Sequence, residues 1–460
     1  MNSEAIAKPL FTKLDLRHLI LPLIIEQALA FSIGVVDTVM VASVGESAVS
    51  GVSLVDAINF LLVTLFTALA TGGAIVAGQY LGMKEPGSAK RAAKHLLLVA
   101  LLVSLLVTVL CLCFNQPILH LLFGRVEADV MHHASTYFYI TALSYPFIAV
   151  YNAAAALFRT MGNGKVPMLN SLVMNVINII GNCIFIFGLG WGVLGAAIAT
   201  LISRIIAAVS IMAMLRRPSL EANIRSYSLR NIEADMIKRI LRIGIPTGLE
   251  NSVFQLGRLV MTNLITTFGT AAVAANAVGV SLSLIGIIPG QAIGLAILTV
   301  VARCMGAGEE AQARHYVRIM MRKAWIYMLL LNVGLMLLIV PTLSLYKLSA
   351  ETYALAFWIL ILHGSAAIAV WVPSFTLPNA LRAAGDARFT MIVSIASMFI
   401  FRVGCSYLLA ELTDLGVWCI WISMAVDWTV RGLCFTLRWK SGKWKSKVVI
   451  EAKQHEKRRR

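Results

Sequence analysis

Residues 16–44 read LRHLILPLIIEQALAFSIGVVDTVMVASV and form one long apolar stretch. It is long enough to cross a lipid bilayer, because a spanning helix needs about 20 predominantly apolar residues. The stretch also carries two carboxylates, Glu26 and Asp37, which lie about three helical turns apart and therefore on nearly the same helix face. An acid near the bilayer centre costs roughly 2.5–3.5 kcal/mol on insertion scales. Both side chains are thus expected to face protein or a water-filled cavity.

The composition indicates that the whole chain, and not only this stretch, belongs to a membrane protein. The chain has 460 residues, of which 59% are hydrophobic and 13% charged, and its mean hydropathy is +0.82. Soluble domains carry about 25% charged residues, so a polytopic membrane protein is predicted. No cleavable signal peptide is expected, since the first apolar stretch is a full-length span. The seven cysteines lack paired metal-ligand spacing, which favours reduced structural thiols and no metal centre.

The hydropathy pattern predicts an all-α protein with twelve transmembrane helices in two six-helix lobes. The spans are expected near 16–44, 48–81, 95–120, 132–158, 166–188, 191–215, 240–267, 271–302, 319–345, 352–380, 389–410 and 415–437. Most lysines and arginines fall in alternate connections and at both termini; Arg125 and Lys347 fall on the opposite side. By the positive-inside rule both termini are predicted to be cytoplasmic, in a cell (inner) membrane.

An internal repeat supports the division into two lobes. With a shift of 224 residues, Pro22 and Glu26 coincide with Pro246 and Glu250. The predicted domains are an N-terminal lobe (1–215), a cytoplasmic linker (216–239), a C-terminal lobe (240–438) and a basic cytoplasmic tail (439–460). Because each lobe has an even number of spans, a pseudo-two-fold axis along the membrane normal is expected.

The net charge of +17 is spread along the chain, and the tail ends in KRRR. Nucleic-acid binding is one explanation of such a tail. Attraction to anionic lipid explains it with fewer assumptions, so the lipid bilayer rather than nucleic acid is the expected partner.

Several motifs resemble those of the multidrug and toxic compound extrusion (MATE) family, in its prokaryotic branch. They are VVDTVMV (35–41), RTMGNGKVPM (159–168), RAAGDARFTM (382–391) and NVINIIGNCIFIFGLGWGVLGAAIAT (175–200). The resemblance implies two lobes around a V-shaped cavity and export of amphipathic organic cations in exchange for H⁺ or Na⁺. It also implies that Asp37 is the ion-coupling acid, with Asn175, Asn178 and Asn182 as polar partners in the fifth span.

The residues themselves suggest the same site. Asp37 and Asp56 are predicted at one depth in the first lobe, where two carboxylates can hold a proton or Na⁺. The three asparagines are spaced for one helix face, and their carbonyl groups can coordinate Na⁺. Alternatively, Asp56 caps a neighbouring helix or merely lies near the membrane interface, and the asparagines are interhelical contacts worth only about 0.6 kcal/mol each.

The second lobe has a different balance of charge. Arg402, Asp427 and Arg431 are predicted to neutralise one another as a structural network, with Asp427 and Arg431 one helical turn apart. Glu26 and Glu250 occupy matched positions and either flank a substrate cavity or make polar contacts between the lobes. Met40 and Met261 are candidates for the cavity lining, although ordinary core packing is the commoner role of such residues.

The leading hypothesis is therefore an antiporter for small organic cations, driven by H⁺ or Na⁺, without an organic cofactor and monomeric. A flippase for a lipid-linked or anionic substrate is the alternative, and it requires cationic residues in the cavity. A membrane enzyme is the third hypothesis, and it requires a catalytic dyad or a metal cluster that the sequence does not display.

Overall fold

The structure is a computed structural model and describes residues 9–124, 126–224 and 232–450. In these ranges every regular element is helical, and the chain divides into two compact units. The amino-terminal unit contains residues 17–248. The carboxy-terminal unit contains residues 249–460 together with residues 1–16. The boundary between the two units therefore lies inside a helix rather than in the connecting segment that precedes it.

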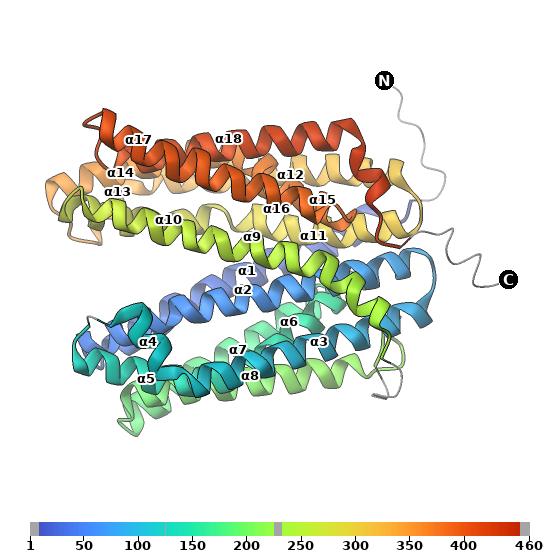
Figure 1. Cartoon of the computed structure of the whole chain (residues 1–460), viewed down its shortest axis with the longest axis horizontal. Helices are drawn as coiled ribbons and strands as arrows, with labels where there is room; N and C mark the ends of the chain where they lie inside the picture. Colours follow the sequence, from blue (N-terminus) through green and yellow to red (C-terminus); the bar gives the residue numbers. More distant parts are fainter. Residues whose placement is uncertain (1–8, 125, 225–231, 451–460) are drawn as a thin grey trace. The chain divides into compact units, whose positions relative to one another are not determined.

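The amino-terminal unit is a bundle of consecutive helices (Figure 1). They are α1 (Lys13–Ala42), α2 (Glu46–Gly82), α3 (Pro86–Cys113), α4 (Asn115–Phe123), α5 (Ala128–Leu143), α6 (Tyr145–Thr160), α7 (Lys165–Asn182) with the π-helical turn η1 (Cys183–Gly188), and α8 (Gly192–Leu215). Helix α2 packs against α3, α5 and α6, and α8 packs against α5, α6 and α7. The bundle therefore places α2 and α8 where they contact most of the other helices of the unit.

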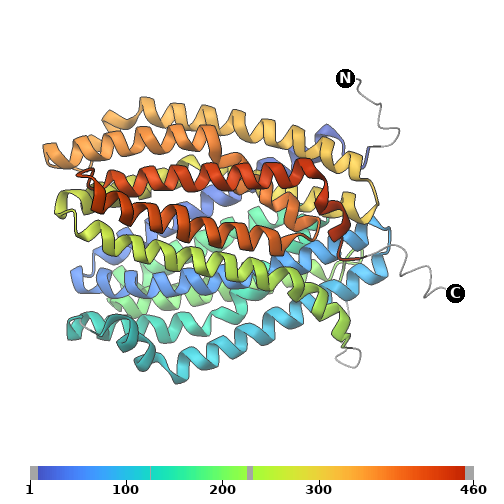
Figure 2. The same ribbon diagram turned by 45° about the horizontal axis from the view of Figure 1, so that its top comes forward.

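Helix α9 (Ala234–Thr266) leads into the carboxy-terminal unit. The elements that follow are α10 (Thr270–Gly286), α11 (Ile288–Gly306), α12 (Glu310–Leu337), α13 (Ile339–Ser344), α14 (Ala350–Ala366), η2 (Ala367–Thr376), α15 (Leu377–Ala383), α16 (Ala387–Ser397), η3 (Met398–Gly404), α17 (Cys405–Leu412), α18 (Trp418–Ser441) and η4 (Lys443–Lys447). Figures 1 and 2 both show the α16–α17 stretch lying alongside α18, which agrees with the packing of η3 and α17 on α18.

Each of the twelve predicted spans coincides with a helix or with consecutive helical segments. By length and composition, ten helices among the described residues can cross a membrane, or eleven when the bent pair α5 and α6 counts as one span. Helix α10 is apolar but has only 17 residues. Helix α9 is long but carries several charged residues, among them Arg239, Arg242 and Glu250. The all-α polytopic fold is confirmed.

Proline accounts for several of the breaks within these spans. The bend of 48° between α5 and α6 precedes Pro146, and the break between α10 and α11 precedes Pro289. Pro373 lies inside the π-helical segment η2. A proline has no backbone N–H and its ring clashes with the preceding turn, so a straight α-helix cannot continue through it unchanged.

Glycine permits close helix contact in the amino-terminal unit. A Cβ atom at Gly72 of α2 would lie 2.5 Å from the carbonyl oxygen of Ile240 and 2.8 Å from the amide nitrogen of Gly244, both on α9. Small residues allow such close approach of helix backbones in membranes, where packing rather than the hydrophobic effect drives helix association.

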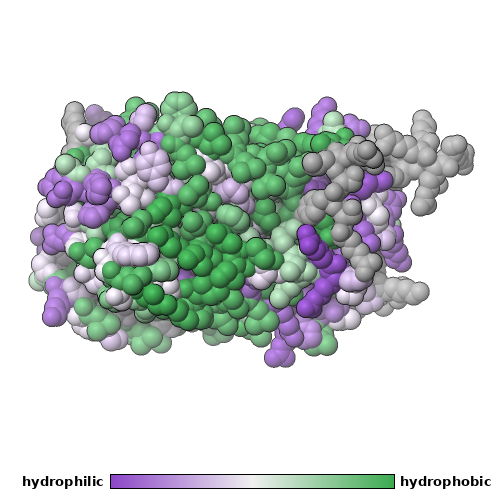
Figure 3. All heavy atoms as spheres, turned by 90° about the horizontal axis from the view of Figure 1, so that it is seen from below, coloured by the Kyte–Doolittle hydropathy of each residue, from purple (hydrophilic) through white to green (hydrophobic). Residues whose placement is uncertain are grey.

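The surface of the bundle is apolar where lipid is expected. Figure 3 shows a broad hydrophobic band on one face, with hydrophilic residues toward both ends of the molecule. On α3 alone, large apolar side chains remain exposed at Leu102, Leu106 and Val109, with exposed fractions of 56%, 61% and 55%. Such a contiguous apolar surface is unusual for a soluble monomer and is typical of a membrane-embedded one.

The first part of the predicted basic tail packs on the carboxy-terminal unit. Trp444 in η4 is fully buried and stacks on Trp439, with ring centroids 4.2 Å apart. Its Nε1 donates a hydrogen bond of 2.9 Å to the carbonyl oxygen of Trp439. The terminal KRRR lies outside the described residues, so the predicted attraction of the tail to anionic lipid stays a prediction.

Candidate functional site

The amino-terminal unit brings Asp37 and Asn182 into direct contact. Asp37 lies on α1 and is half-buried, while Asn182 is the last residue of α7 and is 1% exposed. The Nδ2 group of Asn182 donates a hydrogen bond of 2.7 Å to Oδ1 of Asp37. The α-helix changes to the π-helical turn η1 directly after Asn182. π-Helical turns are frequent at functional sites, and none was predicted from the sequence.

A chain of polar groups continues from this contact. Asn182 Nδ2 also lies 3.2 Å from Oδ1 of Asn178, and Asn178 Nδ2 donates 3.2 Å to Oγ1 of Thr200 on α8. The predicted spacing of these two asparagines on one helix face is therefore realised. Thr200 was missed, because a threonine in an apolar helix carries no distinctive sequence signal.

Asn175 is placed apart from Asp37, although it was predicted with the other two asparagines. Its Nδ2 group donates 3.0 Å to the backbone carbonyl of Leu29 on α1. Asn175 lies two turns before Asn182, which is about 10 Å along the helix, so both cannot reach the same carboxylate. Its contact is the interhelical polar contact that was the alternative expectation.

An unpartnered acceptor lies beside the carboxylate. Oδ1 of Asn182 is buried and has no hydrogen-bond partner among the described residues. An amide carbonyl and a carboxylate are hard oxygen ligands of the kind that alkali and alkaline-earth cations prefer. The same groups can hydrogen-bond a protonated carboxyl. The described residues contain no cluster of three or more histidine, cysteine or acidic side chains that could hold a metal ion, so a Na⁺ ion here would depend on amide oxygens.

The second predicted carboxylate, Asp56, belongs to the same region of the unit. It lies on α2 with an exposed side chain, and it accepts a hydrogen bond of 3.3 Å from Asn59 Nδ2. The hydroxyl group of buried Tyr137 also hydrogen-bonds to Asp56, and Tyr145 donates 2.7 Å to Oδ1 of Asn59. The structure thus connects α2, α5 and α6 near Asp56, and Tyr137 was not predicted.

One arginine acts on both acids. Arg204 on α8 interacts electrostatically with Asp37 and Asp56, and the two carboxylates interact with each other. Its Nη1 donates 2.7 Å to Oγ of Ser144. Two carboxylates near one guanidinium leave one negative charge uncompensated in this part of the unit, which favours uptake of a proton or a cation.

A prediction for Asn182 follows from this geometry. In Asn182→Ala, the concentration of coupling ion that gives half-maximal transport is expected to shift about tenfold, since a hydrogen bond to a charged group contributes about 1.5–3 kcal/mol and 1.4 kcal/mol is tenfold. The concentration should fall for H⁺, because the lost hydrogen bond stabilises the ion-free carboxylate, and rise for Na⁺, because the variant lacks the amide oxygen ligand. The maximal rate at saturating ion should persist because Asp37 remains. Asn175→Ala is the matched control, with a buried amide removed from the same helix. Equal effects of the two substitutions would contradict the assigned role of Asn182.

Glu26 and Glu250 each pair with an arginine inside their own unit. Oε1 of Glu26 lies 3.8 Å from Nη1 of Arg159 on α6, and Oε1 of Glu250 lies 2.8 Å from Nη2 of Arg382 on α15. Both carboxylates are buried. The two pairs occupy equivalent positions of the internal repeat. Of the two predicted roles, this geometry favours structural contacts, although they form within each unit.

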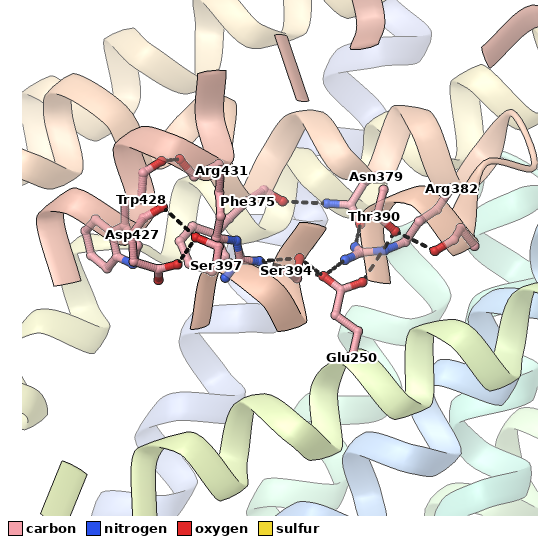
Figure 4. A network of polar contacts seen from close by, with 12 residues as sticks. Glu250, Phe375, Asn379, Arg382, Thr390, Ser394, Ser397, Asp427, Trp428 and Arg431 are labelled. Atoms are coloured by element: carbon pink, nitrogen blue, oxygen red, sulfur yellow. Dashed lines mark hydrogen bonds and ion pairs between the residues drawn. The ribbon is translucent and has the colours of Figure 1, made fainter. Parts of the chain in front are cut away.

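The carboxy-terminal unit holds the larger polar network (Figure 4). In it Glu250 reaches from α9 toward residues of α15 and α16. Besides Arg382, its carboxylate accepts hydrogen bonds of 2.6 Å from Ser394 and 3.4 Å from Thr390. Arg431 of α18 lies 3.6 Å from the same carboxylate. The Glu250 carboxylate is therefore paired with arginine and accepts hydrogen bonds on both of its oxygens.

The predicted network of Arg402, Asp427 and Arg431 is partly corrected. Arg402 Nη1 lies 3.8 Å from Oδ2 of Asp427, as expected, and Ser397 donates 2.5 Å to Oδ1 of Asp427. Asp427 and Arg431 attract each other electrostatically, as expected, but they form no direct ion pair among the described residues. Arg431 instead donates 2.9 Å to Ser394 and approaches Glu250, because the long guanidinium side chain extends across to α16 and α9 rather than back along α18.

Met40 and Met261, predicted as cavity-lining residues, are buried with exposed fractions of 9% and 4%. Neither therefore presents an open face to a substrate in this conformation. The role that the geometry gives them is the core packing that was weighed as the commoner alternative.

The structure accordingly defines a polytopic helical membrane protein with an internal repeat and a half-buried carboxylate on α1, features that are typical of membrane transporters. The MatE family model matches residues 22–184 and again residues 246–408. The two matches are offset by the 224 residues of the internal repeat. The chain belongs to the multidrug and toxic compound extrusion (MATE) family of transporters.

Curated relatives cover nearly the whole chain. An uncharacterized transporter, YisQ of Bacillus subtilis, is 26% identical over 96% of this chain and 97% of its own length. A probable multidrug resistance protein, NorM of Thermotoga maritima, is also 26% identical, over 95% and 94% of the two chains.

Solved structures have the same fold. A MOP superfamily transporter from Pyrococcus furiosus, described by a "reverse polarity of binding pocket", is similar with a TM-score of 0.87 and 20% identity, over 94% of this chain and 96% of the other. An outward-facing multidrug resistance MATE transporter is similar with a TM-score of 0.86, 21% identity and the same coverage.

Proposed function

We propose that this protein is a secondary antiporter that exports small amphipathic organic molecules in exchange for H⁺ or Na⁺. Membership of a family of multidrug exporters supports the export of small molecules. The single observation that supports ion coupling is the hydrogen bond of 2.7 Å between Asn182 and the half-buried carboxylate of Asp37. The unpartnered Oδ1 of Asn182 beside it adds a second oxygen ligand.

The proposed cycle alternates between two states of this carboxylate. Asp37 takes up a proton or Na⁺ from outside and releases it to the cytoplasm, and the ion-free carboxylate is the state that favours cargo binding. A membrane potential of 100 mV supplies about 2.3 kcal/mol for each charge moved. That energy suffices to bias the cycle without ATP, provided that ion and cargo differ in their affinity for the two states. The proposed location is the cell membrane with both termini in the cytoplasm.

Transport into proteoliposomes tests this proposal. Purified protein is reconstituted, a fluorescent organic cation such as ethidium is supplied, and either a pH gradient or a Na⁺ gradient is imposed. Accumulation driven by one of the two gradients is expected, and it should collapse on addition of an ionophore for that ion. Accumulation that is unchanged after both gradients have been dissipated would refute ion-coupled antiport.

A second candidate concerns the charge of the cargo. The flippase or anion-transport alternative requires cationic residues, and the carboxy-terminal unit contains more arginines than acids in its buried polar network. This observation favours a cargo that carries an anionic group, alone or together with a cationic one.

A further inference from the structure

We propose that Arg258, Arg402 and Arg431, called here the arginine cluster, form a binding site for the oxyanion group of a soluble amphipathic molecule, a carboxylate or a phosphate. The inference goes beyond the proposed function, because it concerns ligand binding and does not depend on ion coupling at Asp37. The site itself lies wholly within the carboxy-terminal unit.

The first argument is the charge balance of the buried network. The network contains only two acids, Glu250 and Asp427, but four arginines, which are Arg258, Arg382, Arg402 and Arg431. Its described residues therefore carry two positive charges in excess. Burial of an uncompensated ion costs several kcal/mol even after relaxation. A bound anion would remove much of this cost.

The second argument is the set of unused hydrogen-bond donors. Arg431 is 3% exposed, and its Nε and Nη1 groups have no acceptor among the described residues. Nε of Arg402 is likewise buried without a partner. Buried polar groups are nearly always hydrogen-bonded, so these N–H groups are available to an acceptor that a ligand would bring. Guanidinium groups match the planar, bidentate geometry of carboxylate and phosphate groups.

The third argument is the arrangement of the cluster around aromatic rings. The guanidinium carbons of Arg402 and Arg431 lie 5.4 Å and 5.5 Å from the ring centroid of Phe254, and that of Arg431 lies 4.6 Å from Phe375. The aromatic rings offset part of the repulsion between the cations. They also provide apolar surface for the body of an amphipathic ligand.

Arg258 completes the cluster. It is half-buried on α9, one turn after Phe254 and so on the same helix face, and it is close enough to Arg402 for their charges to repel. Its side chain has no ion pair or hydrogen bond within the described chain. An oxyanion near Arg258 and Arg402 would turn this repulsion into two attractions.

The direct test is ligand binding to the purified full-length protein, which needs no transport. 1-Naphthoate is the probe, and 1-naphthylmethylammonium is the matched cation with the same ring system. Calorimetry should show binding of naphthoate that is at least tenfold tighter than binding of the cation. In Arg258→Gln the affinity for naphthoate should fall about 10- to 100-fold, because a hydrogen bond to a charged group contributes about 1.5–3 kcal/mol.

Two further variants make the test specific. Arg258→Glu should reverse the preference between the two probes, and this substitution leaves no partner of Arg258 unpaired. Arg318→Gln, which removes an exposed arginine of α12 in the same unit, should bind naphthoate as the wild type does. Equal affinity of Arg258→Gln and Arg318→Gln, or naphthoate binding no tighter than the cation in the wild type, would overturn the proposal.

The source of the oxyanion is tested in lipid nanodiscs. Naphthoate affinity is compared in phosphatidylcholine alone and with phosphatidylglycerol added. Unchanged affinity supports a site for soluble anions, whereas loss of naphthoate binding in the phosphatidylglycerol discs would assign the site to a lipid phosphate and overturn the soluble-ligand proposal. Binding is measured without an ion gradient. A failure of ion-coupled transport would therefore not change the interpretation of the binding result.

Discussion

Substitution of Asp37 by asparagine is expected to abolish ion-coupled transport while the protein remains folded. Asparagine has nearly the volume of aspartate and can still accept the hydrogen bond from Asn182, which measures 2.7 Å in the wild-type structure. It cannot bind and release a proton, and it presents no charge to Na⁺. The variant therefore resembles an Asp37 side chain that is always neutral. Its transport cycle should stop after one of the two steps of the exchange.

The measurement is gradient-driven accumulation of ethidium in proteoliposomes, where Asp37→Asn should give the rate of protein-free vesicles. The temperature of thermal unfolding in detergent should change by no more than a few degrees, because asparagine is uncharged and has nearly the volume of aspartate. Glu46→Gln is the matched control, since it neutralises an exposed acid at the start of α2 and should transport normally. Normal coupled transport by Asp37→Asn would place ion coupling elsewhere in the protein.

Asp56→Asn, measured in the same assay, separates the two acids of the site. Asp56 is exposed and is held by Asn59 and Tyr137, whereas Asp37 contacts the asparagine pair. A partial loss in Asp56→Asn is consistent with an auxiliary charge near the site. A complete loss in Asp56→Asn with full activity in Asp37→Asn would exchange their assigned roles.

Replacement of Glu250 by glutamine is expected to cause the largest loss of stability. Glu250 is 4% exposed and is the shared anion of Arg382, at 2.8 Å, and Arg431, at 3.6 Å. Without it, both guanidinium groups lose their carboxylate, and the network gains a third uncompensated positive charge. Removing one partner of a buried ion pair typically costs about 3–5 kcal/mol. In a domain of 150–250 residues each kcal/mol lowers Tm by about 2–4 °C, so a decrease on the order of 10 °C is expected.

The internal repeat supplies the control for this prediction. Glu26→Gln removes the equivalent carboxylate of the amino-terminal unit, but Glu26 lies 3.8 Å from Arg159 and its Oε2 has no partner. A smaller destabilisation is therefore expected. The double variant Glu250→Gln with Arg382→Gln should recover part of the loss, as coupled residues are not additive. Equal thermal stability of Glu250→Gln and Glu26→Gln would contradict the role assigned to Glu250.

Much of the architecture could be predicted from sequence patterns that the lipid bilayer, acting as solvent, imposes on each span. The apolar stretches around residues 16–44 and 166–188, and the repeat that aligns Glu26 with Glu250, are visible in the sequence because lipid imposes length and apolarity on every span. Asp37 stood out for the same reason, since a carboxylate in such a stretch is costly. The spacing of Asn178 and Asn182 placed them on one helix face, and the structure joins that face to Asp37.

The partners of the charged and polar side chains were predicted less well from the sequence. Asp427 and Arg431 are one turn apart, yet Arg431 approaches Glu250, which lies far away in the sequence. Asn175 shares a face with Asn182 but contacts the backbone of Leu29. Local spacing fixes which residues share a helix face, but it does not fix which helix faces them.

The sequence by itself therefore determined a helical membrane transporter of two repeated halves, with an acid at Asp37, because the bilayer acts on each span independently of its neighbours. Only the tertiary structure decided that Asn182 and not Asn175 contacts Asp37, that Glu250 joins two arginines, and that Arg258, Arg402 and Phe254 come together. These outcomes depend on the rotation and depth of one helix against the next. Helix rotation and depth are set by packing between helices distant in the chain, which no local pattern encodes.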